Sequence, residues 1–152
     1  MRVNVETGEV TADGRHVYAD GTTPNIIAGT YTNSVPGTAD TQPFDINGAA
    51  GWLVLQDPPN DGILNQIGSI GMTPTEVGFD IATDSEGVNS AWLVVDGTFY
   101  SLDLTNGSKT EAGMIEGANV RDIGSCRVSN ARPLKTCSRA RHSAAAPPPR
   151  PK

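Results

Sequence analysis

The 152-residue sequence has little of what marks several large protein classes. Aromatic residues make up only 5% and cysteines number two, so the core should be small and aliphatic and a disulfide-rich scaffold is excluded. No apolar run approaches the roughly 18 residues that a membrane-spanning helix needs. Residues 1–6 hold no apolar run that could act as a secretory signal. One ordinary domain, or one domain with a tail, is therefore expected.

Basic residues are scarce in most of the chain. Residues 1–122 hold all 17 acids and only four bases, a net charge of −13, whereas residues 123–152 hold seven bases and no acid. Because the acidic body would repel phosphates, no nucleic-acid partner is expected for it. The basic tail could touch polyanions or bind weakly to its own acidic body. A split this sharp suggests two segments of different origin or role.

The boundary is set at residue 123, which separates a β-repeat domain, 1–123, from a tail, 124–152. The tail is basic and rich in proline and alanine, with three consecutive prolines at 147–149, and is predicted to be disordered. Cys126 and Cys137 both lie in it, at a spacing that matches no zinc site. They are expected to be free thiols, and a disulfide between them would require an oxidising compartment.

Glycine and proline together make 28 residues, and some of the glycines recur in a pattern. Residues 3–8 and 102–107 both read as apolar, Asn or Asp, apolar, two polar residues and glycine. In each copy a second glycine follows six residues later. A third copy begins at 44–46 and is interrupted by the apolar segment 52–55. The three glycine pairs are Gly8 with Gly14, Gly62 with Gly68, and Gly107 with Gly113. Their offsets, 54 and 45 residues, are typical of propeller blades.

Local patterns indicate strands throughout the body. Tyr100, Leu102 and Leu104 alternate with polar residues, which is the period of a half-buried strand. An Asp-Gly pair at 96–97 between apolar runs predicts a type I′ hairpin. Residues 91–115 are therefore predicted to form a three-stranded meander. Segments 77–81 and 120–123 should open successive units, and 56–62 should form a turn. No segment shows a helical period. We predict an all-β fold, a partial β-propeller-like stack of antiparallel meanders with about two and a half repeat units.

Candidate site residues are few, and no catalytic residue is predicted. Asp45, Asp80 and Asp103 occupy matched places, where they are expected to cap turns by accepting backbone N–H groups. Asp80, Asp84 and Glu86 could instead supply oxygen ligands to calcium, although their spacing is not that of an EF-hand loop. No other cofactor is expected.

Three other side chains complete the candidates. His16, the only histidine of the body, is expected to be a solvated loop residue. Trp52 and Trp92 each begin a Trp-Leu-Val segment and are expected in the core. If they are exposed instead, their flat rings would suit stacking against a sugar or another ligand.

Several phrases in fixed order resemble a known family. They are residues 19–34, the turn 58–62 with the glycines at 68 and 71, and the segments 77–81 and 100–104. This order resembles the bacterial proteins of domain-of-unknown-function family 4394, whose repeats read like Leu-Tyr-x-Ile-Asp-x-x-Thr-Gly followed by Val-Gly-x-Ile-Gly. The resemblance covers residues 2–123. It implies a propeller-like β-repeat fold, often in exported proteins, and it supplies no activity, substrate or catalytic residue. The location of this chain is left open.

Departures from the family pattern suggest that the chain is a fragment of a longer propeller-like protein. Pro43 stands where the family has a strand start, and its missing N–H favours an edge position. The repeat pattern and the acids both stop near Ile123, which suggests a tail that is translated out of frame or is otherwise foreign to the body. An unclosed ring leaves open sheet edges, so self-association or marginal stability is expected.

Three functions remain open at this level. The first is a non-enzymatic β-repeat binding or scaffold module. The second is a propeller-type hydrolase that acts on a sugar or lactone at a cluster of Asp and Glu. The third is a gene fragment with no function of its own.

Overall fold

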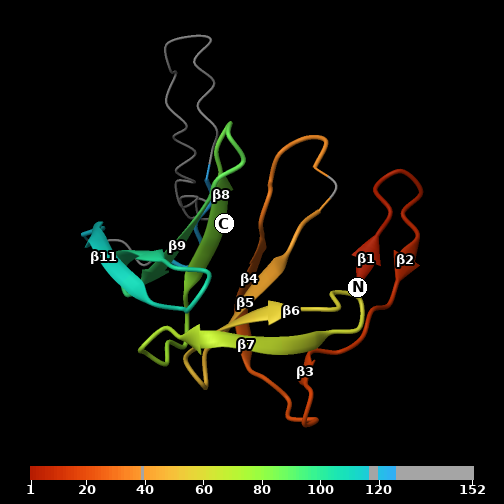
Figure 1. The fold of residues 1–152 in the computed structure, drawn as a ribbon, viewed down its shortest axis with the longest axis horizontal. Helices are drawn as coiled ribbons and strands as arrows, with labels where there is room; N and C mark the ends of the chain where they lie inside the picture. Colours follow the sequence, from red (N-terminus) through yellow and green to blue (C-terminus); the bar gives the residue numbers. More distant parts are fainter. Residues whose placement is uncertain (39, 117–119, 126–152) are drawn as a thin grey trace, which may run out of the picture.

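A computed structural model describes residues 1–38, 40–116 and 120–125. These residues form eleven strands and no helix, which confirms the all-β prediction (Figure 1). No helix capable of crossing a bilayer therefore occurs in them. Cys126, Cys137 and nearly all of the predicted tail lie outside the described residues.

The larger sheet has five strands in the order β3-β7-β6-β5-β4. Four of them follow one another along the chain and pair antiparallel: β4 (Ile26–Tyr31), β5 (Pro43–Asn47), β6 (Trp52–Gln56) and β7 (Ile63–Ser69). The short strand β3 (Val17–Tyr18) adds to β7 in parallel. A segment that precedes the meander in sequence therefore covers its last edge.

The second sheet is a four-stranded antiparallel meander. It contains β8 (Gly78–Thr83), β9 (Asn89–Val95), β10 (Thr98–Leu102) and β11 (Lys109–Met114), paired in chain order. The predicted meander at 91–115 is thus confirmed. The turn between β9 and β10 has φ of 49° at Asp96 and 78° at Gly97, the positive values that a type I′ turn requires.

The third sheet is a hairpin of β1 (Arg2–Val3) and β2 (Val10–Thr11). Its loop repeats the loop between β10 and β11. The Asn4 N–H donates to the Glu9 carbonyl at 2.9 Å, just as the Asp103 N–H donates to the Ser108 carbonyl at 2.8 Å. Gly8 and Gly107 close the two loops with φ of 73° and 76°. The similarity seen in the sequence therefore corresponds to one loop geometry.

The third copy of that phrase was aligned wrongly from the sequence. Asp45 lies in the middle of β5, whereas the residue that opens the corresponding loop is Asp57, whose N–H donates to the Ile63 carbonyl at 2.9 Å. Gly62 closes this loop with φ of 74°, so the glycine was assigned correctly. The loop is one residue longer than the other two and contains two prolines, which hid the match.

Two strand predictions also fail. Pro43 is not on an edge strand, because β5 lies between β4 and β6. It is tolerated as the first residue of its strand, where β6 does not yet pair with it. Residues 120–123 are not a strand, although they lie beside Gly78.

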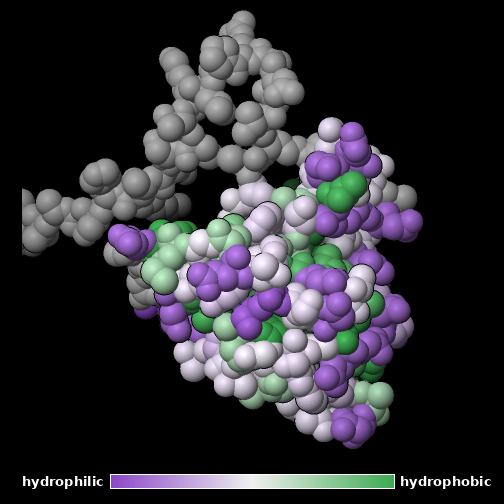
Figure 2. Space-filling view, turned by 60° about the vertical axis from the view of Figure 1, so that its left-hand side comes forward, coloured by the Kyte–Doolittle hydropathy of each residue, from purple (hydrophilic) through white to green (hydrophobic). Residues whose placement is uncertain are grey.

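The core lies where the two large sheets face each other, and β4 and β8 are adjacent there. It is aliphatic apart from two phenylalanines, as the composition predicts, and Ile46, Leu53 and Leu93 have no exposed surface. On the face shown in Figure 2, hydrophobic side chains are scattered among hydrophilic ones.

Glycines allow successive sheets to approach through their backbones. A Cβ at Gly68 in β7 would lie 1.8 Å from the carbonyl oxygen of Asn106, in the loop before β11. A Cβ at Gly14 would lie 2.1 Å from the carbonyl oxygen of Asp61, in the loop before β7. Both positions are therefore restricted to glycine by contact with another sheet's loop.

Gly68→Ala should lower the free energy of unfolding by about 1–3 kcal/mol, because a methyl group cannot fit against the Asn106 carbonyl. Urea unfolding followed by circular dichroism measures this as a lower midpoint with an unchanged slope. Gly124→Ala is the control, since no described atom lies within 4 Å of a Cβ there. Equal midpoints for the two variants would contradict the contact.

Candidate binding site

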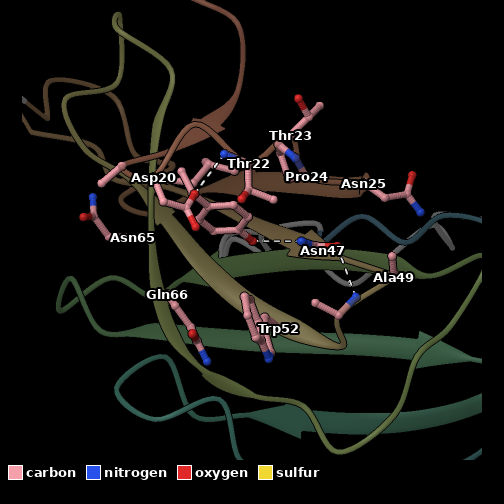
Figure 3. A pocket seen from close by; sticks show the side chains of 14 residues that line it. Asp20, Thr22, Thr23, Pro24, Asn25, Asn47, Ala49, Trp52, Asn65 and Gln66 are labelled. Atoms are coloured by element: carbon pink, nitrogen blue, oxygen red, sulfur yellow. Dashed lines mark hydrogen bonds between the residues drawn. The ribbon is translucent and has the colours of Figure 1, made fainter.

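A cavity of about 830 Å³ opens at one end of the five-stranded sheet (Figure 3). The loop before β4 forms one wall, and the start of β6 with the middle of β7 forms the opposite wall. In Figure 3, Trp52 and Gln66 lie across the cavity from Thr23, Pro24 and Asn25. The walls thus come from segments far apart in the sequence.

Tyr18 joins these walls. It ends β3, where it pairs with Leu64 of β7, and its ring meets Trp52 edge to face with centroids 6.0 Å apart and planes at 81°. The Tyr18 hydroxyl accepts a hydrogen bond of 2.8 Å from Nδ2 of Asn47. Asn47 is itself buried at the end of β5, and its Oδ1 accepts from the Ala50 N–H. The aromatic pair is therefore held in place by the sheet.

The wall formed by the loop before β4 contains a tight turn. The Tyr18 N–H donates to the Thr22 carbonyl at 3.0 Å, and Gly21 reverses the chain with φ of 84°. Oδ1 of Asp20 accepts the Thr22 N–H at 2.8 Å. This backbone hydrogen bond, with the Thr22 side chain, lowers the pKa of Asp20, so the carboxylate is charged at neutral pH.

The cavity lining is amphipathic. Carbon surface comes from Trp52, Tyr18 and Leu64, and polar groups come from amide and hydroxyl side chains. Those polar side chains are Thr22, Thr23, Asn25, Asn47, Asn65 and Gln66. Among the described lining residues Asp20 is the only carboxylate and there is no histidine. A neutral ligand with many hydroxyl groups fits this chemistry, because amides both donate and accept hydrogen bonds.

Trp92 lies elsewhere, in β9. It stacks on Phe99 with centroids 4.9 Å apart and planes at 14°, and it lines a separate cavity of about 310 Å³ with Asp80 and residues 123–125. Both tryptophans are half-buried, so they are more exposed than the expected core positions would make them. Only Trp52 lies beside a cluster of polar side chains.

The residues considered for calcium are not brought together. No three His, Cys, Asp or Glu side chains in the described part of the chain form a metal-binding group. Oδ1 of Asp84 accepts the N–H groups of Glu86 and Val88 and so caps a turn. Asp80 accepts hydrogen bonds from Thr30 and from the Ser125 N–H. Burial by itself would raise the pKa of Asp80, but these hydrogen bonds outweigh it and the pKa is lowered.

Of the three aspartates expected to cap turns, only Asp103 does so. Its Oδ1 accepts the Thr105 N–H and hydroxyl, and these bonds lower its pKa. Asp80 lies within β8, and Asp45 is buried within β5. Oδ2 of Asp45 has no hydrogen-bond partner in the described part of the chain. His16, as expected, is an exposed loop residue.

Burial raises the pKa of Asp45, against a smaller opposing effect of His16. In the unfolded chain the carboxyl group has its ordinary pKa, so charging it costs the folded state more than the unfolded state. This cost is absent below the unfolded pKa and appears as pH rises through the raised, folded value. Asp45→Asn should therefore increase the free energy of unfolding at pH 7 and change it less near pH 3.

Urea unfolding of both proteins at the two pH values measures this difference. A gain from Asp45→Asn that is the same at pH 3 and pH 7 would contradict a buried charge. Asp20→Asn is the control with the opposite sign, because hydrogen bonds lower its pKa and stabilise its charged form.

Comparison with known proteins places the chain in a family. No curated protein matches the chain, and no solved structure does so either. The sequence model described as Domain of unknown function (DUF4394) matches residues 1–124, which include every strand found in the described residues. The resemblance noted in the sequence is thus confirmed, and the chain belongs to the family Domain of unknown function (DUF4394).

Proposed function

We propose that this chain is a non-enzymatic β-repeat binding module whose sheets are consecutive blades of a propeller-like fold. The support is architectural. Two four-stranded antiparallel meanders, β4–β7 and β8–β11, follow one another, and their first strands β4 and β8 are adjacent. The β1–β2 hairpin has the loop geometry of β10–β11 and supplies the half unit.

The ligand that we propose is a neutral sugar or oligosaccharide, bound in the cavity of Tyr18 and Trp52. The observation that carries this proposal is the half-buried Trp52 ring, fixed by Tyr18 and surrounded by amide and hydroxyl groups. The C–H face of a sugar can stack on an indole, while its hydroxyls need hydrogen-bond partners that can both donate and accept. Asn25 and Gln66 are exposed and can provide them.

Hydrolysis of the bound sugar is not favoured by this cavity. Glycosidases generally use two carboxyl groups, placed about 5–9.5 Å apart, and one of them has a raised pKa. Asp20 stands alone among the described lining residues, and its pKa is lowered. The buried Asp45 has a raised pKa but does not line the cavity. The lining can therefore hold a ligand without the pair of groups that cleavage needs.

Trp52→Ala should weaken sugar binding about fivefold or more, because stacking of this kind contributes on the order of 1 kcal/mol or more. Isothermal titration calorimetry with neutral α-linked and β-linked glucose oligosaccharides measures the affinity. Trp52→Phe keeps an aromatic face and should retain part of the binding. Gln66→Ala changes an exposed side chain of the lining and should weaken binding without affecting the fold.

Trp92→Ala is the matched control, because Trp92 is equally half-buried and begins the same Trp-Leu-Val segment outside this cavity. Binding lost equally in Trp52→Ala and Trp92→Ala would point to unfolding, and near-ultraviolet circular dichroism would reveal it. Binding unchanged in both Trp52→Ala and Gln66→Ala would contradict this site.

A further inference from the structure

We propose that the outer face of β11 of one copy of this chain docks on the β1–β2 hairpin of a second copy. The two surfaces are complementary halves of a contact that the chain already makes twice within itself. The inference depends on these internal contacts and is independent of the ligand proposed for the cavity.

The first internal contact joins the segment after β2 to the loop before β7. The Gly14 N–H donates to the Asn60 carbonyl at 2.9 Å. A Cβ at Gly14 would lie 2.1 Å from the Asp61 carbonyl oxygen, and a Cβ at Gly62 would lie 2.4 Å from the Arg15 carbonyl oxygen. Neither glycine can gain a side chain, because each packs against the backbone of the other segment.

The second internal contact joins β7 to the loop before β11 in the same way. A Cβ at Gly68 would lie 1.8 Å from the Asn106 carbonyl oxygen, and a Cβ at Gly107 would lie 2.8 Å from the carbonyl carbon of Gly68. Nearby, Nζ of Lys109 donates to the Ile70 carbonyl at 2.6 Å. In both contacts the second glycine of one glycine pair meets the first glycine of the next pair: Gly14 meets Gly62, and Gly68 meets Gly107.

One glycine at each end of this series has no such neighbour. No described atom lies within 4 Å of a Cβ built at Gly8, the first glycine of the first pair, or at Gly113, the second glycine of the last pair. Gly113 is nevertheless placed as Gly68 is: both follow an extra residue that shifts the register, opposite Phe99 and Leu53 respectively. Gly8 has the φ of Gly107. In a contact between two copies, Gly113 of one copy can therefore take the place of Gly68, and Gly8 of the other copy can take the place of Gly107.

Apolar side chains are exposed at both ends. On the hairpin, Val3, Val5 and Val10 are 52%, 97% and 58% exposed, whereas Leu102, the counterpart of Val3, is only 6% exposed. At the end of β11, Met114 and Ile115 are 66% and 42% exposed. These five residues are most of the exposed large hydrophobic side chains of the described chain, the others being Met1, Tyr31 and Val88. A contact that covers them would remove this apolar surface from water.

A contact between different surfaces of two copies is heterologous. It leaves one free surface at each end of the pair, so assembly continues until a ring closes or a filament grows. Both surfaces carry charges of both signs, Arg2, Glu6 and Glu9 on the hairpin and Lys109, Glu111 and Glu116 in or after β11.

Chemical cross-linking tests the pairing directly. In a background of Cys126→Ser and Cys137→Ser, one variant carries Val10→Cys and another carries Ile115→Cys. These positions correspond to Lys109 and Ile70, which are in contact inside the chain. A short bismaleimide should join the two variants only when they are mixed, and a chain with both cysteines should give a ladder of multimers.

Cross-linked dimers from either single variant alone, as abundant as those from the mixture, would overturn head-to-tail docking in favour of a symmetric contact. The absence of cross-linking in the mixture and in the doubly substituted chain would overturn docking altogether.

Sedimentation velocity gives a second measurement without new cysteines. The unmodified chain should show association that depends on concentration. Val5→Asp and Met114→Asp should each raise the dissociation constant at least about tenfold, because each places a charge in the apolar contact. Val88→Asp is the matched control, an exposed valine in the turn between β8 and β9 that should leave the constant unchanged. A monomer at all concentrations, or equal effects of all three variants, would overturn the proposal.

Discussion

The close approach of backbones at glycine positions is the constraint on which this structure depends. Gly14 and Gly68 each bring a segment so near to the loop of the next sheet that no side chain fits between them. The sheets can then stack closely enough for Leu53 and Leu93 to be sealed from water. Burial of aliphatic side chains provides most of the stabilisation, but it requires a distance between the sheets that only these glycines allow.

The cavity follows from the same arrangement. With the meander β4–β7 fixed, its edge strand β7 is open to pairing, and β3 fills that place in parallel. This pairing puts Tyr18 over Trp52, where Asn47 holds the Tyr18 hydroxyl. The cavity is thus made by ordinary sheet pairing and one tight turn. It has fixed aromatic faces and adaptable amides, the combination on which the proposed sugar binding depends.

The sequence allowed most of the strands to be predicted, because alternation and turn residues are local signals. The Asp-Gly turn at 96–97 and the glycines that close the loops were located correctly. Asp45 and Pro43 were misplaced, since their environments depend on which strands flank β5. Trp52 was found as a candidate by its residue type, but Tyr18 and Asn47 were missed. A parallel pairing of two-residue length leaves no periodic signal, and nothing local shows that residues 18, 47 and 52 meet.

The position of β3 has one more implication, which concerns how such a protein can change in evolution. The segment that seals the edge of the five-stranded sheet belongs to the stretch of chain linking one sheet to the next. Duplicating or deleting β3 together with β4–β7 would keep the last edge of that sheet covered, whereas in the described residues β11, the last edge of the second sheet, has no such strand. A cut made between β3 and β4 would instead separate a sheet from its own seal and divide the aromatic pair between two pieces.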